Sequence, residues 1–429
     1  MKFKILNVGR VESADIDLCG ITVLAGANGT GKSTISRSLM SISSVSRRIN
    51  SLILAERGRS IIKILQESFR KNGGDVFYSE SIFNGSVNKL LQGLDPEWWE
   101  DAAKVVAWLR EHNRQEMVIF PNSFLEGDKC LHSVHDATPQ IREVLVRSDD
   151  EYVMYICRKL FKKAFSGQLK PVFATHSDSV ITVETEGVPK EHITVKFKDG
   201  EVDAHEEIGR TFYPSVVYFE PINYVDFVNN TEAPISDRYS AGGYCSCNVI
   251  KKEPPKNLSL EEQHELDEAN EIIKDIISSI HGRLVDDDEA DIKFNEKFAN
   301  GSHLINVKNI ASGMKTMAAI VRAVENRSVR RGSLLIIDEP ESNLHPKWQV
   351  AFASFLTAFV QRLGVFVLLN THSPYFMQAI NVYSGRKGIP CKFYDMIIKG
   401  DVSRTEEITN QLDRVFRTMS EPFNDLIGQ

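Results

Sequence analysis

One octapeptide near the N-terminus limits the possible folds of this 429-residue chain more than any other feature. The segment Gly26-Ala27-Asn28-Gly29-Thr30-Gly31-Lys32-Ser33 fits the pattern G-x4-G-K-[ST] and is followed by Thr34. It comes directly after the apolar, β-branched run at 21–25 and before a helical pattern. Because this is the strand–loop–helix context of a phosphate-binding loop, we predict an α/β fold that binds a nucleotide.

The residue types in this loop suit a nucleotide phosphate. Glycines let backbone N–H groups turn inward around phosphate oxygens, and the following helix N-terminus adds its positive dipole end. Lys32 is predicted to reach the β- and γ-phosphates, and the Ser33 hydroxyl to bind Mg²⁺. We therefore predict ATP and Mg²⁺ as cofactors, and the predicted contact residues in this loop are Gly26, Asn28, Gly29, Gly31, Lys32, Ser33 and Thr34.

Two carboxylates end a second apolar strand late in the chain. The run Leu-Leu-Ile-Ile at 334–337 predicts a strand buried on both faces, and Asp338 and Glu339 follow it. Such a strand places its last side chains at the carboxyl edge of the sheet, where ligands bind in α/β folds. We predict that Asp338 binds Mg²⁺, directly or through water, and that Glu339 is the general base for the attacking water.

Three further positions are candidates for the same site. His372 follows the apolar run at 365–369, so we predict that it reaches the γ-phosphate from the tip of a neighbouring strand. Gln168 is predicted to touch Mg²⁺ and the attacking water, with an ordinary surface glutamine as the alternative reading. Ser312-Gly313 opens a helical pattern whose N-terminal N–H groups would suit a phosphate.

The order of the remaining patterns predicts a mixed sheet. From 309 onward, loop, helix, buried strand, helix and buried strand imply parallel strands with crossover helices. Residues 180–220 alternate like antiparallel strands, with Asp199-Gly200 as a hairpin turn. Residues from about 34 to 165 are mostly helical in pattern. The capping-box spacing of Ser259 and Glu262 predicts a helix start.

Composition excludes several classes of protein. No apolar run reaches about 18 residues, so we expect no membrane span. Six cysteines spread over the whole chain favour a reducing compartment, and we predict a cytoplasmic protein. The net charge of −7 argues against a uniformly basic nucleic-acid binder. It leaves open local basic clusters at 158–163 and 327–331.

Together, these motifs resemble the ABC-type ATPase heads of the SMC, Rad50, RecF and OLD group. The octapeptide is similar to Walker A, Asp338-Glu339 to Walker B, and His372 to the switch histidine. Residues 342–346 resemble the D-loop, Gln168 is the candidate for the Q-loop, and Ser312-Gly313 falls at the signature motif. The resemblance implies a P-loop ABC-type head of the α/β class with a mixed sheet, an antiparallel β part and a long helical insertion.

The stretch from 311 to 376 is closer still to one branch of this group. It is similar to the ATPase subunits of bacterial anti-phage systems of the Septu or PARIS type and to the ATPase half of OLD-family proteins. Its Ala-Ser-Gly-Met-Lys differs from the Leu-Ser-Gly-Gly-Gln of transporters, and no long coiled coil is expected. Few residues follow His372, so we also expect no fused nuclease domain.

The motifs and pattern changes predict a division into segments. We expect a first ATPase lobe with Walker A and the Q-loop candidate, interrupted by the helical insertion. A loop-rich and helical linker region, a second lobe with signature, Walker B and switch histidine, and a C-terminal tail follow. In this order the segments are 1–40 with 165–227, 41–164, 228–300, 301–390 and 391–429.

The resemblance implies that two heads pair around two ATP molecules, with the signature of one facing the Walker A of the other. We therefore predict an ATPase that forms homo-oligomers. It would act as sensor or scaffold in anti-phage defence and control a separate effector, a nuclease from a neighbouring gene. Nucleic acid would be contacted through the complex, and no membrane is expected. The alternative is a RecF- or Rad50-like DNA-repair ATPase, and a transporter ATPase is a weaker one.

Overall fold

The chain divides into two compact units. In the computed structural model, unit 1 comprises Met1–Arg47 with Arg158–Gln429, and unit 2 comprises Arg48–Cys157. The predicted insertion at 41–164 encloses unit 2 and extends a few residues beyond it at both ends. The structure describes residues 1–72, 101–113, 128–170, 178–185, 191–209, 211–220, 225, 228–229, 246–289, 291–413 and 415–416.

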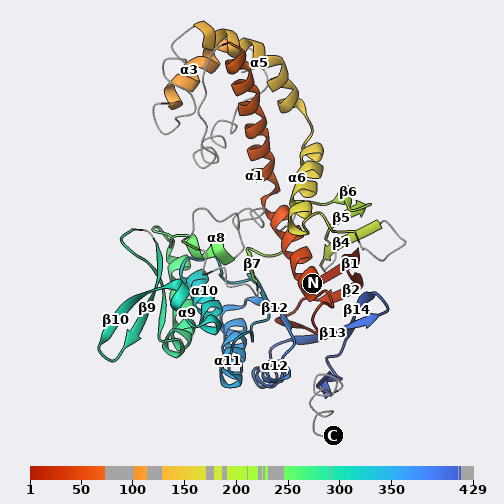
Figure 1. Cartoon of the computed structure of the whole chain (residues 1–429), viewed down its shortest axis with the longest axis vertical. Coiled ribbons are helices and arrows are strands. Elements are labelled where there is room, and N and C mark those ends of the chain that lie inside the picture. Colours follow the sequence, from red (N-terminus) through yellow and green to blue (C-terminus); the bar gives the residue numbers. More distant parts are fainter. Residues whose placement is uncertain are drawn as a thin grey trace. The chain divides into compact units, whose positions relative to one another are not determined.

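Unit 1 is built on a sheet in which eleven strands are described (Figure 1). Their order across the sheet is β6-β5-β4-β1-β2-β14-β13-β3-β12-β11-β7. The strands are β1 (Lys2–Val8), β2 (Val11–Asp17), β3 (Ile21–Ala25), β4 (Asp178–Glu184), β5 (His192–Lys198), β6 (Glu201–Glu206), β7 (Val216–Phe219), β11 (Leu334–Asp338), β12 (Phe366–Thr371), β13 (Cys391–Lys399) and β14 (Val402–Glu407). The last two strands lie in the segment that the sequence assigned to a C-terminal tail.

One half of this sheet is parallel. The neighbours β13, β3, β12, β11 and β7 all pair in parallel. Every residue of β3, β7 and β11 is buried, as expected for strands covered on both faces. The chain runs β11–α11–β12–α12–β13, with α11 at Pro346–Leu363 and α12 at Pro374–Lys387. The predicted parallel strands with crossover helices are thus confirmed.

The strands from β6 to β2 are antiparallel, and β14 joins them to the parallel half, antiparallel to β13 and parallel to β2. Strands β1 and β2, β1 and β4, β4 and β5, and β5 and β6 all pair in antiparallel orientation. Asp199 and Gly200 make the β5–β6 hairpin turn with φ angles of 52° and 85°, which matches the predicted turn. The fold is therefore of the α/β class with a large mixed sheet, as predicted.

A group of helices packs against one face of the parallel strands (Figure 1). The core they share takes alternate residues from the strands, such as Val23, Ile337 and Leu369. Ser259 caps the first of these helices, and the capping box with Glu262 is present as predicted. The helices are α9 (Leu260–Ser279), α10 (Ser312–Glu325), α11 and α12.

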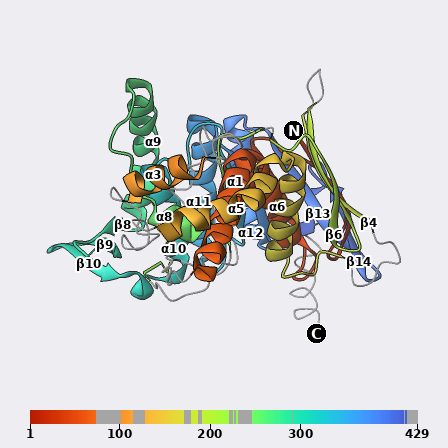
Figure 2. The same cartoon turned by 90° about the horizontal axis from the view of Figure 1, so that it is seen from above.

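A smaller antiparallel sheet adjoins α9 and α10 (Figure 2). It contains β8 (Gly282–Asp286), β9 (Ile292–Phe298) and β10 (Gly301–Asn306), and β8 is the strand that contacts both helices. Among the described residues, the short helix α8 (Ser246–Lys251) also contacts α10. Ser312-Gly313 lies at the start of α10.

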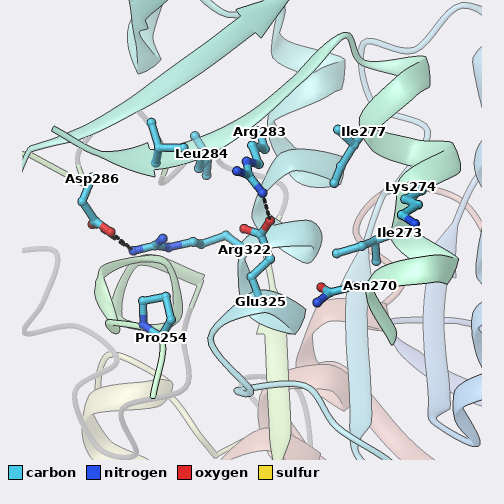
Figure 3. Close-up of a pocket in the computed structure, with 11 residues that line it drawn as sticks. Pro254, Asn270, Ile273, Lys274, Ile277, Arg283, Leu284, Asp286, Arg322 and Glu325 are labelled. Atoms are coloured by element: carbon cyan, nitrogen blue, oxygen red, sulfur yellow. Dashed lines mark hydrogen bonds and ion pairs between the residues drawn. The ribbon is translucent and has the colours of Figure 1, made fainter. Parts of the chain in front are cut away.

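A pocket of about 560 Å³ lies between α9, β8 and α10 (Figure 3). Figure 3 shows two ion pairs in it, Arg322 with Asp286 and Arg283 with Glu325. The Arg322 side chain is 5% exposed and donates to both Asp286 oxygens at 2.6 and 2.8 Å. It also donates to the Ile250 carbonyl oxygen at 3.2 Å, so it ties α10 to β8 and to α8.

Replacing Arg322 by methionine is expected to lower the free energy of unfolding by about 2 to 3 kcal/mol. The change keeps much of the apolar stem but leaves Asp286 and the Ile250 carbonyl without their buried donor. Denaturant unfolding measures the effect. Arg404→Met, which breaks an exposed pair with Glu12, is the control and should leave the same free energy nearly unchanged.

Unit 2 is helical in the residues described. It contains most of α1 (Lys32–Lys71), together with α3 (Ala102–Asn113), α5 (Asp128–Val146) and the first part of α6 (Asp149–Ala164). The apolar residues Ile61, Leu65 and Phe69 of α1 and Val134 and Ile141 of α5 are buried. The predicted helical insertion is confirmed to this extent. No described helix of either unit is long and apolar enough to cross a bilayer.

Candidate functional site

The carboxyl ends of the parallel strands in unit 1 bring the predicted site residues to one edge of the sheet. Ala25 at the end of β3 lies opposite Thr371 of β12, and Asp338 at the end of β11 lies opposite Asn370. The residues that follow these strands are the phosphate loop, His372 and Glu339. The parallel sheet therefore collects motifs that lie more than 300 positions apart in the sequence.

The phosphate loop has the backbone geometry that its glycines predict. Gly26 and Gly31 have φ angles of 141° and 98°, which other residues rarely adopt. A Cβ at Gly31 would lie 2.7 Å from Cγ2 of Val11, and one at Gly26 would lie 2.9 Å from Cβ of Met396. Strain and lack of space together exclude a side chain at both positions.

Lys32 begins α1 and folds back over the loop. Its Nζ donates to the carbonyl oxygens of Gly26 and Ala27 at 2.7 and 2.9 Å, and the residue is only 6% exposed. Burial lowers the pKa of Lys32, while the carboxylates of Glu339, Glu341 and Asp338 raise it, in that order. The ammonium group thus lies within electrostatic reach of these three carboxylates and of Asp395.

Asp338 is held by hydrogen bonds from several elements. The Tyr218 hydroxyl donates to its Oδ2 at 2.7 Å, and the Asn370 amide donates to its Oδ1. Burial raises the pKa of the Asp338 carboxyl, and hydrogen bonds from Tyr218, Ser33 and Ser36 lower it. The residue is 3% exposed, so these donors fix the position of its carboxylate next to Ser33 at the start of α1.

Ser33 and Asp338 fit a magnesium ion that also takes ligands from a nucleotide. The Ser33 hydroxyl hydrogen-bonds to Asp338, so one oxygen from each side chain can contact the same cation. Mg²⁺ is held by one or two such oxygens together with phosphates and water. The described residues contain no group of three or more His, Cys, Asp and Glu side chains that could hold a metal by themselves.

Glu339 has an unusual backbone conformation. Its φ angle is 49°, in the left-handed region that costs a non-glycine residue about 1 to 3 kcal/mol. Its N–H donates to the Asn370 carbonyl oxygen at 2.8 Å, which anchors this turn to β12. The Ser342 hydroxyl donates to Oε2 of Glu339 at 3.1 Å, and Nδ1 of His372 lies 4.0 Å from Oε1.

The sequence did not identify Glu341 as part of this site. Its Oε1 accepts hydrogen bonds from the Thr371 hydroxyl at 2.7 Å and from the His372 N–H at 2.8 Å. The same oxygen lies 3.5 Å from Nδ1 of His372. The sequence shows only a glutamate after Pro340 in a predicted loop. Its contacts with Thr371 and His372 depend on the fold.

The start of α10 packs against the predicted D-loop. A Cβ at Gly313 would lie 2.6 Å from Cδ2 of Leu344 and 2.8 Å from the carbonyl oxygen of Asn343. The helix begins at Ser312 after Ala311, and no side chain caps it. The close approach explains why a glycine follows Ser312, because any side chain there would force the D-loop away.

Gln168 lies beside the turn between β1 and β2, where a Cβ at Gly9 would lie 3.4 Å from Cγ2 of Thr34. It is exposed in the turn after α6, and its neighbour Leu169 accepts a hydrogen bond from the Gly9 N–H at 2.9 Å. The residue that follows β7 is Glu220, and β7 lies beside β11 with Phe219 opposite Ile337. Glu220 therefore reaches the edge next to Asp338, whereas the predicted role of Gln168 stays a prediction.

Comparison with known proteins gives one family match. Residues 240–378 match the family described as "AAA domain, putative AbiEii toxin, Type IV TA system". This segment contains Ser312-Gly313, Asp338-Glu339 and His372. No curated protein matches the chain.

Solved structures of SMC heads are similar over nearly the whole chain, at low identity. An SMC head bound to the C-winged helix domain of ScpA has 10% identity and a TM-score of 0.42, and the match covers 96% of this chain and 98% of that one. The SMC head domain from Thermotoga maritima has 11% identity and a TM-score of 0.39, with 95% and 97% covered. An SMC head from Pyrococcus furiosus with an extended coiled coil, bound to the C-terminal domain of ScpA, has 9% identity and a TM-score of 0.41, with 98% of both chains covered.

Proposed function

We propose that this chain binds ATP with Mg²⁺ at the sheet edge of unit 1 and hydrolyses it. One observation carries the proposal: Lys32, Ser33, Asp338, Glu339 and His372 lie at or after the ends of three neighbouring parallel strands, β3, β11 and β12, and meet at one edge. A buried lysine on a glycine loop can bind phosphate oxygens, and the carboxylates that it faces can bind the accompanying cation. The Lys32 variant argued in the Discussion tests the proposal.

Each side chain has a task that follows from its contacts. Lys32 exchanges its loop carbonyl partners for phosphate oxygens. Ser33 and Asp338 would hold Mg²⁺, which neutralises phosphate charge when it is bound. Glu339 accepts a proton from the attacking water, and His372, whose side chain is 44% exposed, donates to the γ-phosphate.

The proposal includes pairing of two copies around ATP. The first N–H groups of α10 have no side-chain cap, so they are suited to donate hydrogen bonds to a phosphate of ATP bound to a second copy. Ser312-Gly313 would contribute to the partner's site. The contact of Gly313 with Leu344 and Asn343 joins this helix end to the D-loop, so pairing and the hydrolytic site would be linked.

Replacing Ser312 by arginine is expected to spare ATP binding but to abolish pairing and lower hydrolysis by about 100-fold. The bulky cation would block the approach of α10 to the partner's nucleotide. Molecular mass in solution with ATP, together with hydrolysis rates, measures both effects. Ser302→Arg, on the exposed strand β10, is the control. Loss of ATP binding to the Ser312 variant itself would contradict the assignment of Ser312 to the partner's site.

In the cell, the proposed role is a cytoplasmic ATPase that acts as sensor or scaffold in anti-phage defence. It would control a separate effector, a nuclease from a neighbouring gene, and Septu- or PARIS-type ATPases are the relatives that the sequence resembles. The family description, which names a toxin of a type IV toxin–antitoxin system, is in keeping with such a role. The mass of the complex that co-purifies with and without ATP tests it.

A RecF- or Rad50-like DNA-processing ATPase is the second candidate. Its support from the sequence was the pair of basic clusters at 158–163 and 327–331. In the structure, Arg158 pairs with Glu201 at 3.2 Å, and Arg327 pairs with Glu265 at 3.0 Å. Because these carboxylates offset part of the positive charge, the clusters favour the second candidate less than the sequence suggested. ATP hydrolysis that is stimulated by DNA alone would favour the DNA-processing role.

A further inference from the structure

We propose that Glu341 is a positioning residue for His372, and this inference rests on the ATP hydrolysis proposed above. Glu341 lies on the loop after β11, and His372 lies directly after β12. Oε1 of Glu341 accepts hydrogen bonds from the Thr371 hydroxyl and from the His372 N–H, and it lies 3.5 Å from Nδ1 of the ring. One carboxylate oxygen thus contacts the backbone and approaches the side chain of the residue that would face the γ-phosphate.

The loop that presents His372 is otherwise buried. Thr371 and Ser373 are buried on either side of it, whereas the His372 side chain is exposed by almost half. The Thr371 hydroxyl donates to Glu341 and accepts from the Ser373 N–H at 3.0 Å. Glu341 therefore contacts a buried, hydrogen-bonded loop from which the His372 imidazole projects.

The same loop is tied to the predicted D-loop. The Ser373 hydroxyl donates to Oε1 of Gln349 at 2.7 Å, and Nε2 of Gln349 donates to the Leu344 carbonyl oxygen at 3.0 Å. Leu344 is also the residue against which Gly313 packs. A continuous set of contacts thus joins the start of α10 to the loop that Glu341 and His372 share.

Burial argues that Glu341 does more than fill space. The residue is 5% exposed, and its Oε2 is buried without a hydrogen-bond partner in the part of the chain that the structure describes. A buried carboxylate oxygen in that state is unfavourable, and an apolar side chain of similar size would avoid it. Retaining a carboxylate here is explained if its other oxygen must hold the His372 loop.

A double-mutant cycle tests the inference, with kcat and KM for ATP measured for each variant. Glu341→Leu removes the acceptor and is expected to lower kcat by about 30-fold, with KM within about threefold. Glu341→Gln keeps an acceptor oxygen and should lower kcat by only about threefold. In a His372→Ala background, Glu341→Leu should lower kcat by less than about twofold, because its effect acts through the imidazole.

Other results would overturn the inference while leaving the proposed function intact. One is an unchanged kcat for Glu341→Leu. Another is a kcat for the double variant that falls by the product of the two single effects, because Glu341 would then act independently of His372. Glu261→Gln, on the exposed start of α9, is the control and should match the unsubstituted protein.

A second variant keeps the test decisive if Glu341→Leu does not fold, which thermal unfolding would reveal. Thr371→Val removes the hydroxyl that donates to Glu341, and the same cycle with His372→Ala applies to it with the same expected outcome. Failure of the proposed function looks different. The unsubstituted protein would then hydrolyse ATP no faster than the Lys32→Ala variant.

Discussion

A Lys32→Ala variant is expected to bind ATP about 10- to 100-fold more weakly and to lower kcat/KM by about 1,000-fold. Lys32 carries the one ammonium group of the phosphate loop, which is proposed to contact the phosphates. Alanine removes both the charge-assisted contact in the ground state and the larger stabilisation of charge in the transition state. Titration with a fluorescent ATP analogue and a phosphate-release assay measure the two effects separately.

The control for this variant is Lys256→Ala, which removes an exposed lysine far along the chain. It should leave both measurements unchanged. Thermal unfolding without ATP checks the fold, because Lys32 also donates to Gly26 and Ala27 and offsets nearby carboxylates. A Lys32→Ala protein that is folded and hydrolyses ATP at the normal rate would show that the phosphate loop is not the nucleotide site.

The parts of the site that could be predicted from the sequence lie within short contiguous segments. The apolar run before Gly26 and the one before Asp338 each predict, without any distant residue, that a buried strand ends there. Parallel strands then bring both ends to one edge without any further information. The same reasoning places His372, which follows the next buried strand along the chain.

The parts that could not be predicted depend on contacts between distant elements. Tyr218 donates to Asp338 across 120 positions, and its own segment reads only as a short apolar strand. Asn370 and Glu341 lie beside predicted motifs, but their partners depend on the pairing of β11 with β12 and on how the two loops meet.

Glu220 illustrates the same limit for a residue that no local motif marks. Which strand lies beside β11 is decided by sheet order, and the structure gives that place to β7, so Glu220 reaches the edge. Local patterns identify strands, but neighbours in a sheet of mixed direction depend on the whole topology.

The positive φ angle of Glu339 connects the fold to the proposed chemistry. A glycine would adopt this conformation without strain, so the backbone cost of a glutamate here is in keeping with a functional role for its side chain. The turn is anchored by its N–H to Asn370 and by Ser342 to its carboxylate. These contacts hold the carboxylate near His372, where the proposed hydrolysis needs a proton acceptor.

Replacing Glu339 by glutamine is therefore expected to lower hydrolysis by about 100- to 10,000-fold while ATP binding is retained. The amide has the same shape and can still accept from Ser342, but it cannot take a proton from water. Because ATP then persists in the site, two copies should remain paired, and the mass in solution should double when ATP is added. Glu271→Gln, on the exposed face of α9, is the control and should turn over ATP normally.

Two combined variants decide whether the doubled mass comes from the proposed pairing. Adding Ser312→Arg to Glu339→Gln should return the mass to that of one copy while ATP stays bound, because the α10 contact to the partner is blocked. Adding Lys32→Ala should also give one copy, but without ATP. A Glu339→Gln protein that binds ATP and remains a single copy would contradict pairing around the nucleotide. Its loss of hydrolysis would still assign Glu339 as the general base.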